Sequence, residues 1–218
     1  VFMAQPFSLR YPLITVKGNS GNIQGDPAAH YRYTEAKLST FGELLLEDID
    51  KETVDMQNNY DNTTKEPIAL GGYFPNALVN PTMGIAVGIA TTFAPHYLKD
   101  IIEATCTMIG HMIKDEDTDI EELISIVKAP DFPTGGTIVN ASDIPNIYRT
   151  GHGRITLRSK YRIEQKKNTK QIVFYELPYK ISYTSMMEGL IILSDSIPDI
   201  KDIRDESSRE GLRIVIEL

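Results

Sequence analysis

Two hydrophobic periodicities follow one another in this chain, and together they constrain its fold most strongly. The first has the spacing of an amphipathic helix and comprises Leu98, Ile101, Ile102, Thr105, Met108, Ile109, Met112 and Ile113. The second has the period of a β-strand, with Ile155, Leu157, Tyr161 and Ile163 alternating with Arg154, Arg158, Lys160 and Arg162. This strand would have one apolar and one basic face. We therefore predict an α+β fold.

Weaker patterns predict the remaining elements. From Thr34 we expect a helix, because Leu38, Phe41, Leu45 and Ile49 recur at helical spacing. A second helix is expected to start at residues 118–121, where TDIE fits a capping box, with Leu123, Ile124 and Val127 on its buried side. The run EQKKNTKQ would turn the predicted strand into IVFYELPY and form a hairpin. A short helix around residues 184–194 and a last strand, LRIVIEL, complete the pattern.

The composition excludes several kinds of site. Cys106 is the only cysteine, so an intrachain disulfide and thiol-based zinc sites are excluded, and we expect this residue to pack inside its helix. The four histidines show no metal-ligand spacing, and the acidic run DEDTDIEE lacks the glycine and final glutamate of an EF-hand loop. The formal net charge of −8 disfavours nonspecific binding of nucleic acid by the whole chain. A DNA-binding role would therefore require a locally basic face or a partner that supplies charge.

The same sequence sets expectations for location and organisation. No apolar run approaches the ~20 residues of a membrane span, and the N-terminal residues lack the features of a signal peptide, so we expect a cytoplasmic protein. The chain starts with VFMAQ and ends with RIVIEL, and we expect it to be a piece of a longer protein. The polar stretch DMQNNYDNTTKEP, at residues 55–67, is the expected domain boundary.

The sharpest chemical feature is the sequence Tyr31-Arg32-Tyr33, which follows a glycine-rich, turn-prone stretch. A tyrosine hydroxyl ordinarily has a pKa of about 10, so the nucleophilic phenolate is rare at neutral pH. An adjacent guanidinium favours the phenolate and also stabilises charge on a phosphoryl group under attack. Surface tyrosines beside an arginine are nevertheless common. The residues alone therefore leave both a nucleophile and an ordinary surface loop open.

Two further stretches have more than one interpretation. The run GIAVGIA, at residues 84–90, lacks the spacing of either phosphate-binding glycine motif, and close packing of small residues explains it better. Ile85 within this run is expected in the core; if it protruded, it would be able to wedge between DNA base steps. The basic strand face either follows a phosphate backbone or is simply solvated.

Several segments together resemble the A subunit of bacterial type IIA topoisomerases, the family of DNA gyrase A and topoisomerase IV A. The matching runs are MAQPFSLRYPL, GNIQGDPAA, RYTEAKL, KETVD, NYDNT, LVNPTMGIAVGIAT, PDFPTGG, YRTGHGRI, ELPY and RDESSREGLRIVIEL. They occur in the family's order and cover nearly the whole chain. The resemblance implies the C-terminal part of a winged-helix domain over residues 1–66 and an α+β tower domain over residues 67–218.

The resemblance also implies roles for individual residues. Tyr33 matches the tyrosine that attacks a DNA phosphodiester and becomes joined to the 5′ end, and Arg32 matches the arginine that assists phosphoryl transfer. Tyr31 stands where the family usually has methionine and is taken as a bystander. Ile85 matches the isoleucine that intercalates and bends DNA. We expect the DNA to meet Arg10 and Lys17 as well, together with Arg32 and part of the basic strand face.

By the same resemblance, the parent protein is the breakage-reunion subunit of an ATP-dependent type II topoisomerase. Its partners would be double-stranded DNA, a second A subunit, and two B subunits, in an A2B2 heterotetramer. Mg²⁺ and ATP would both be held by the B subunit, with none bound by this chain. Two alternatives stay open: a non-catalytic DNA-binding and bending module, and a small-molecule α/β enzyme with GIAVGIA as its nucleotide loop.

Overall fold

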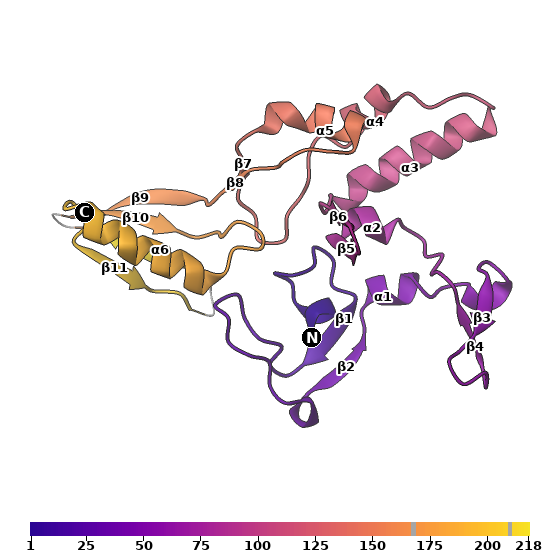
Figure 1. The fold of residues 1–218 in the computed structure, drawn as a ribbon, viewed down its shortest axis with the longest axis horizontal. Helices are drawn as coiled ribbons and strands as arrows, with labels where there is room; N and C mark the ends of the chain where they lie inside the picture. Colours follow the sequence, from indigo (N-terminus) through magenta and orange to yellow (C-terminus); the bar gives the residue numbers. More distant parts are fainter. Residues whose placement is uncertain (167–168, 209–210) are drawn as a thin grey trace. The chain divides into compact units, whose positions relative to one another are not determined.

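In the computed structural model, residues 1–166, 169–208 and 211–218 are described. The chain forms two compact units, one made of Val1–Ser20 and Ala28–Thr118, the other of Gly21–Pro27 and Asp119–Leu218. Each contains short helices and small antiparallel sheets (Figure 1), which confirms the α+β class. These units describe packing; the boundary between residues 66 and 67 stays a prediction.

The first unit is built from two-stranded sheets and helices. Its strands are β1 (Ile14–Lys17), β2 (Glu35–Leu38), β3 (Met56–Asn58), β4 (Lys65–Pro67), β5 (Thr82–Ala86) and β6 (Ile89–Phe93). Its α-helices are α1 (Thr40–Leu44), α2 (Asn76–Val79) and α3 (Leu98–Ile113), and its 3₁₀-helices are η1 (Phe2–Ala4), η2 (Tyr31–Tyr33) and η3 (Ile49–Lys51). The strands pair in sequence order, β1 with β2, β3 with β4 and β5 with β6.

The segment after Tyr33 forms a strand, so the helix predicted from Thr34 is wrong at its start. β2 pairs with β1 in an antiparallel ladder. α1 begins only at Thr40, where the side chain of Ser39 accepts a hydrogen bond from the amide of Gly42. The ladder pairs the backbone groups along one edge of β2 with β1, and this pairing with a distant segment outweighs the local helical spacing.

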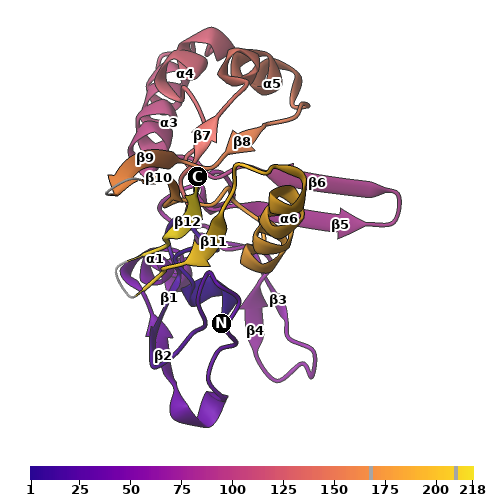
Figure 2. The same cartoon turned by 90° about the vertical axis from the view of Figure 1, so that its left-hand side faces the viewer.

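β5 and β6 form a hairpin with a two-residue turn. Ala86 pairs with Ile89, which leaves Val87 and Gly88 at the tip, and Gly88 has a φ of +76°. A positive φ is easily adopted only by glycine, so the last glycine of GIAVG is required by the turn. Figure 2 shows the hairpin from the side, as two long arrows joined at a narrow tip.

An aromatic cluster and α3 form the core of the first unit. The ring of Phe41 packs edge-on against Tyr11, with centroids 5.1 Å apart, and against Phe74, 6.1 Å away. α3 confirms the predicted amphipathic helix, with Ile101 and Ala104 buried. Cys106 is exposed, so its expected burial is wrong. It comes five residues after Ile101, which turns it to the other side of a helix with 3.6 residues per turn.

The second unit contains a four-stranded antiparallel sheet in the order β11-β12-β10-β9. Its strands are β7 (Thr137–Ile138), β8 (Leu157–Arg158), β9 (Tyr161–Lys166), β10 (Thr169–Phe174), β11 (Asp202–Asp205) and β12 (Ile214–Glu217). Its helices are α4 (Ile120–Ile126), α5 (Ile144–Thr150), α6 (Tyr183–Ser196) and the 3₁₀-helix η4 (Ala141–Asp143). α6, the last strand and the hairpin of β9 with β10 were all predicted, and they are confirmed; residues 167–168 of the predicted turn lie outside the described residues.

Two details of this unit differ from the sequence predictions. The N-cap of α4 is Asp119, whose side chain accepts a hydrogen bond from the Glu121 amide, rather than Thr118. Leu123, Ile124 and Val127 are half-buried, not fully so. The predicted apolar strand face is exposed at Ile163, because β9 is an edge strand and α6 contacts β11, at the opposite edge.

Throughout the described ranges, no helix combines the length and apolar character needed to cross a membrane.

Candidate functional site

The Tyr-Arg-Tyr sequence forms an ordered turn that exposes its side chains. The amide of Tyr33 donates to the His30 carbonyl oxygen at 2.9 Å, and the hydroxyl of Thr34 donates to the Tyr31 carbonyl oxygen at 3.1 Å. The residue Tyr33 is nevertheless 69% exposed. Local hydrogen bonds therefore hold the backbone of the turn while the phenol remains accessible from solvent.

The backbone just after β1 packs closely against this turn. Gly18 follows β1 with a φ of +124°, and a Cβ there would lie 3.0 Å from the methyl carbon of Thr34 and 3.2 Å from the carbonyl oxygen of Tyr33. Only a residue without a side chain fits easily at that distance and φ. Gly18 thus allows the backbone after β1 to approach the turn closely. The sequence signal for it was the glycine-rich stretch itself, which we interpreted only as a loop.

Arg32 lies beside the phenol that it was predicted to assist. Its guanidinium carbon, Cζ, is 5.2 Å from the centroid of the Tyr33 ring, a cation–π distance. Arg32 is itself exposed. The two residues thus present a hydroxyl and a fixed positive charge together at the surface, an arrangement that suits attack on an anionic phosphodiester.

The other two predicted basic contacts lie on the same unit. Lys17 ends β1 and pairs in register with Glu35, the first residue of β2; their side chains approach at 3.5 Å and are about four-fifths exposed, 82% and 77%. Such an exposed ion pair is weak, so Lys17 remains available to a phosphate. Arg10 lies over the ring of Tyr11, with its guanidinium carbon 5.0 Å from the ring centroid.

Ile85 protrudes from β5 instead of lying in the core. The residue is 79% exposed, and Val87 at the tip of the hairpin is fully exposed. Its expected burial is wrong because each strand of a two-stranded hairpin covers only one edge of its partner and leaves both faces open. An exposed isoleucine on a narrow hairpin has the shape that insertion between base pairs requires.

On the basic strand face of the second unit, Lys160 and Arg162 are compensated by carboxylates. Arg162 pairs with Glu164 at 2.6 Å, and Lys160 with Glu176 at 3.2 Å. Glu164 also accepts from Arg213 at 2.7 Å. The hydrogen bonds from Arg213 and Arg162 lower the pKa of Glu164 to about 2, so it stays ionised. This pairing favours a solvated ion-pair face over a path for a phosphate backbone.

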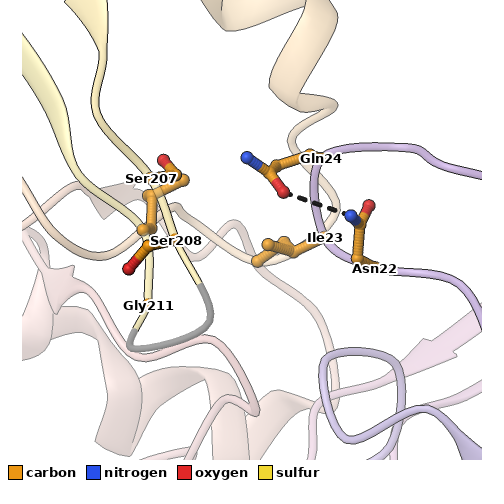
Figure 3. A pocket seen from close by; sticks show the side chains of 7 residues that line it. Asn22, Ile23, Gln24, Ser207, Ser208 and Gly211 are labelled. Carbon is orange, nitrogen blue, oxygen red and sulfur yellow. Dashed lines mark hydrogen bonds between the residues drawn. The ribbon is translucent and has the colours of Figure 1, made fainter.

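Two other features bear on ligand chemistry. In the described part of the chain, no group of three or more His, Cys, Asp or Glu side chains is placed to hold a metal ion. An open hollow of about 330 Å³ in the second unit is lined by Asn22, Ile23, Gln24, Ser207, Ser208, Gly211 and Leu212 (Figure 3). The amide of Asn22 donates to Gln24 across 3.1 Å within it. Uncharged residues line this hollow, and none of them belongs to the Tyr33 turn.

Comparison with known proteins identifies the family. A family model that describes the A subunit of DNA gyrase/topoisomerase IV matches residues 1–218. The chain belongs to this family. It is 47% identical over 221 residues to the DNA gyrase A subunit of Aminobacterium colombiense and 46% identical over 221 residues to that of Thermotoga maritima. It is also 43% identical over 222 residues to the DNA gyrase A subunit of Chlamydia muridarum.

Each of these matches covers 100% of this chain but only 26–27% of the relative. The chain therefore spans about a quarter of the length of the gyrase A subunits that it matches. Membership of the gyrase/topoisomerase IV A family agrees with the resemblance seen in the separate sequence runs. One buried residue in those runs, Asn80 of LVNP, was given no role from the sequence; its position before a proline and a hairpin was the available signal.

Proposed function

We propose that this chain is the DNA breakage-reunion part of a type II topoisomerase A subunit. The observation that carries the proposal is the exposed Tyr33 phenol on an ordered turn, with the Arg32 guanidinium against its ring. Membership of the gyrase/topoisomerase IV A family supports the same function. In this proposal the residues 1–66 are the end of a winged-helix domain and residues 67–218 a tower domain.

The proposed reaction is a transfer of one phosphoester bond. The Tyr33 oxygen, having lost its proton, attacks a backbone phosphorus; the bond from that phosphorus to the 3′ oxygen breaks, and the 3′ hydroxyl leaves with a proton. The 5′ phosphate is then joined to Tyr33. Arg32 stabilises the added negative charge on the phosphoryl oxygens. Attack by the 3′ hydroxyl reverses the step, so resealing needs no ATP.

The partners follow from the same proposal. Two A subunits would each cleave one strand of a duplex, so that a second duplex passes between the ends before they are rejoined. Divalent metal, bound by the B subunit, supplies further charge stabilisation at the phosphate. The B subunit would also bind ATP, and the assembly would be an A2B2 heterotetramer. Arg10 and Lys17 would contact the backbone of the cleaved duplex, and Ile85 would bend it.

The test uses the full-length A subunit with its B subunit, Mg²⁺ and plasmid DNA. Cleavage is trapped with denaturant, the protein is digested, and the peptide linked to DNA is mapped. An adduct on Tyr33 is expected. No adduct on any tyrosine, with DNA bending intact, would favour the second candidate, a non-catalytic bending module, for which the exposed Ile85 hairpin is the supporting observation.

A further inference from the structure

Asn80 connects two segments of the first unit that are far apart in sequence. It is only 2% exposed, and its side-chain oxygen accepts a hydrogen bond from the Tyr11 amide at 2.8 Å. Its side-chain amide donates to the Tyr11 carbonyl oxygen at 3.0 Å and to the Asn76 side-chain oxygen at 2.8 Å. One buried side chain thus pairs with both the amide and the carbonyl group of Tyr11. These two hydrogen bonds fix the position of the Tyr11 backbone relative to Asn80.

Tyr11 is connected to the Tyr33 turn through β1 and β2. It lies three residues before β1, and β1 pairs along its whole length with β2, which starts two residues after Tyr33. The Tyr11 hydroxyl accepts a hydrogen bond from the Leu98 amide at 3.0 Å, so the same residue also holds the start of α3. A displacement of the backbone at Tyr11 would therefore be carried by an ordered ladder to the base of the turn.

Asn80 is also connected to the hairpin of β5 and β6, which begins two residues after it. Only Pro81 separates it from β5, and the Thr82 hydroxyl donates back to the Asn80 carbonyl oxygen at 3.3 Å. The chain leaving β6 is held close by, since Nδ1 of the buried His96 is 2.8 Å from the Leu78 carbonyl oxygen. Both ends of the hairpin that carries Ile85 are consequently attached around residues 78–80.

We propose that Asn80 is a positioning residue that sets the Ile85 hairpin in register with the Tyr33 turn. This inference rests on the proposed function. DNA bent by Ile85 presents its scissile phosphate to Tyr33 only if hairpin and turn keep a fixed relationship, and the side chain of Asn80, through its two bonds to the Tyr11 backbone, is a direct link between the two segments. Loss of that link changes the coupling between bending and cleavage while leaving the nucleophile itself intact.

The experiment compares Asn80→Ala with Asn76→Ala in the full-length A subunit, in complex with its B subunit. Asn76→Ala removes one partner of the Asn80 amide but leaves both bonds to Tyr11. DNA bending is measured by energy transfer between dyes at the ends of a duplex, and cleavage by the trapped Tyr33 adduct. Circular dichroism checks folding. If Asn80→Ala does not fold, Asn80→Asp replaces it, because a carboxylate still accepts from the Tyr11 amide but cannot donate to its carbonyl.

We expect Asn80→Ala to lower adduct formation on an intact duplex by about tenfold or more, as small misplacements of reacting groups do, and to reduce bending. Asn76→Ala should resemble the wild type. The decisive readout is a series of duplexes with single-nucleotide gaps at successive positions beside the cleavage site, since a gap lowers the cost of bending. One gap position should restore the adduct in Asn80→Ala, which a general folding defect would not allow.

Two results would overturn the inference. They are wild-type cleavage in Asn80→Ala, or a cleavage defect that no gap rescues. These results differ from failure of the proposed function, in which the wild-type enzyme itself bends DNA but forms no Tyr33 adduct; in that case both fall.

Discussion

The guanidinium carbon of Arg32 lies 5.2 Å from the centre of the Tyr33 ring, on a turn where both side chains are exposed. The cation therefore does not have to be brought to the phenol by a conformational change. What remains is for a phosphate to enter beside both groups.

Removal of the Tyr33 hydroxyl should abolish the DNA adduct completely. Tyr33→Phe keeps the ring and its contact with Arg32 but has no oxygen to attack phosphorus. Tyr31→Phe is the matched control: it removes the other exposed hydroxyl of the turn and should leave the adduct in place. Denaturant trapping followed by peptide mapping measures both. Retention of an adduct in Tyr33→Phe would contradict the assignment of the nucleophile.

Arg32→Ala should slow cleavage by about 10²–10³-fold, the usual cost of losing one donor to a transition-state oxyanion. Duplex affinity at fixed salt should change little by comparison. Arg10→Ala should have the opposite pattern, with weaker binding, a salt dependence reduced by about one unit of slope, and a nearly unchanged single-turnover cleavage rate. Equal effects of the two variants on the cleavage rate would argue against distinct roles.

Ile85→Ala should reduce DNA bending, because the methyl side chain is too short to separate stacked base pairs. Val87→Ala is the control: Val87 is fully exposed two residues away, at the turn of the same hairpin, so the change removes apolar surface without removing the proposed wedge. Energy transfer across an end-labelled duplex measures the bend. A loss of bending in Val87→Ala and none in Ile85→Ala would move the wedge to the tip.

Gly42→Ala should destabilise the first unit by about 1–3 kcal/mol, as overpacking commonly does. A Cβ at Gly42 would collide with the Leu13 carbonyl oxygen. That oxygen accepts a hydrogen bond from the Ser39 amide at 3.0 Å, between the end of β2 and the start of α1. Gly110→Ala, on α3 with no atom within 4 Å of the new carbon, should instead stabilise by about 0.5–1 kcal/mol. Thermal unfolding compares them, and equal shifts would exclude a role for the close contact.

Glu164→Gln should lower the melting temperature at neutral pH. The hydrogen bond from Arg213 is the largest cause that lowers the pKa of Glu164 from 4.5 to about 2. Because the folded pKa is the lower one, the ion pair stabilises the fold above pH 4.5 and this contribution disappears as the pH falls toward 2. The difference from the wild type should shrink over that range. Glu188→Gln, at an exposed position of α6, is the matched control and should leave the melting temperature at neutral pH nearly unchanged.

The elements that were predicted correctly are those whose pattern lies in neighbouring residues. α3 shows its helical spacing within 16 residues, and the hairpin of β9 with β10 is a local pairing. β12 pairs with the distant β10, but its own alternation was enough to predict a strand. β2 was missed because its partner, β1, is formed by residues about twenty positions earlier. The helical spacing from Leu38 to Ile49 does not reveal that pairing.

In the candidate site, too, the contact between neighbouring residues was the one that could be predicted. Arg32 and Tyr33 are neighbours in sequence, so their contact was foreseeable from chemistry and resemblance together. The burial of Ile85 was misjudged because isoleucine alone does not reveal that its hairpin has no covering layer in the first unit. Asn80 was invisible for a further reason: its importance lies in hydrogen bonds to backbone atoms of Tyr11, and any residue at position 11 other than proline would offer those same atoms.

The short segment Gly21–Pro27 packs in the second unit although the residues on both sides of it pack in the first. The polypeptide therefore passes between the units after Ser20, after Pro27 and after Thr118. A single cut at Thr118 would not yield two complete halves, because the first would retain seven residues whose partners had been removed. A chimaera that takes one unit from a relative therefore cannot be made with a single junction. To keep each unit intact it needs three junctions, after Ser20, after Pro27 and after Thr118.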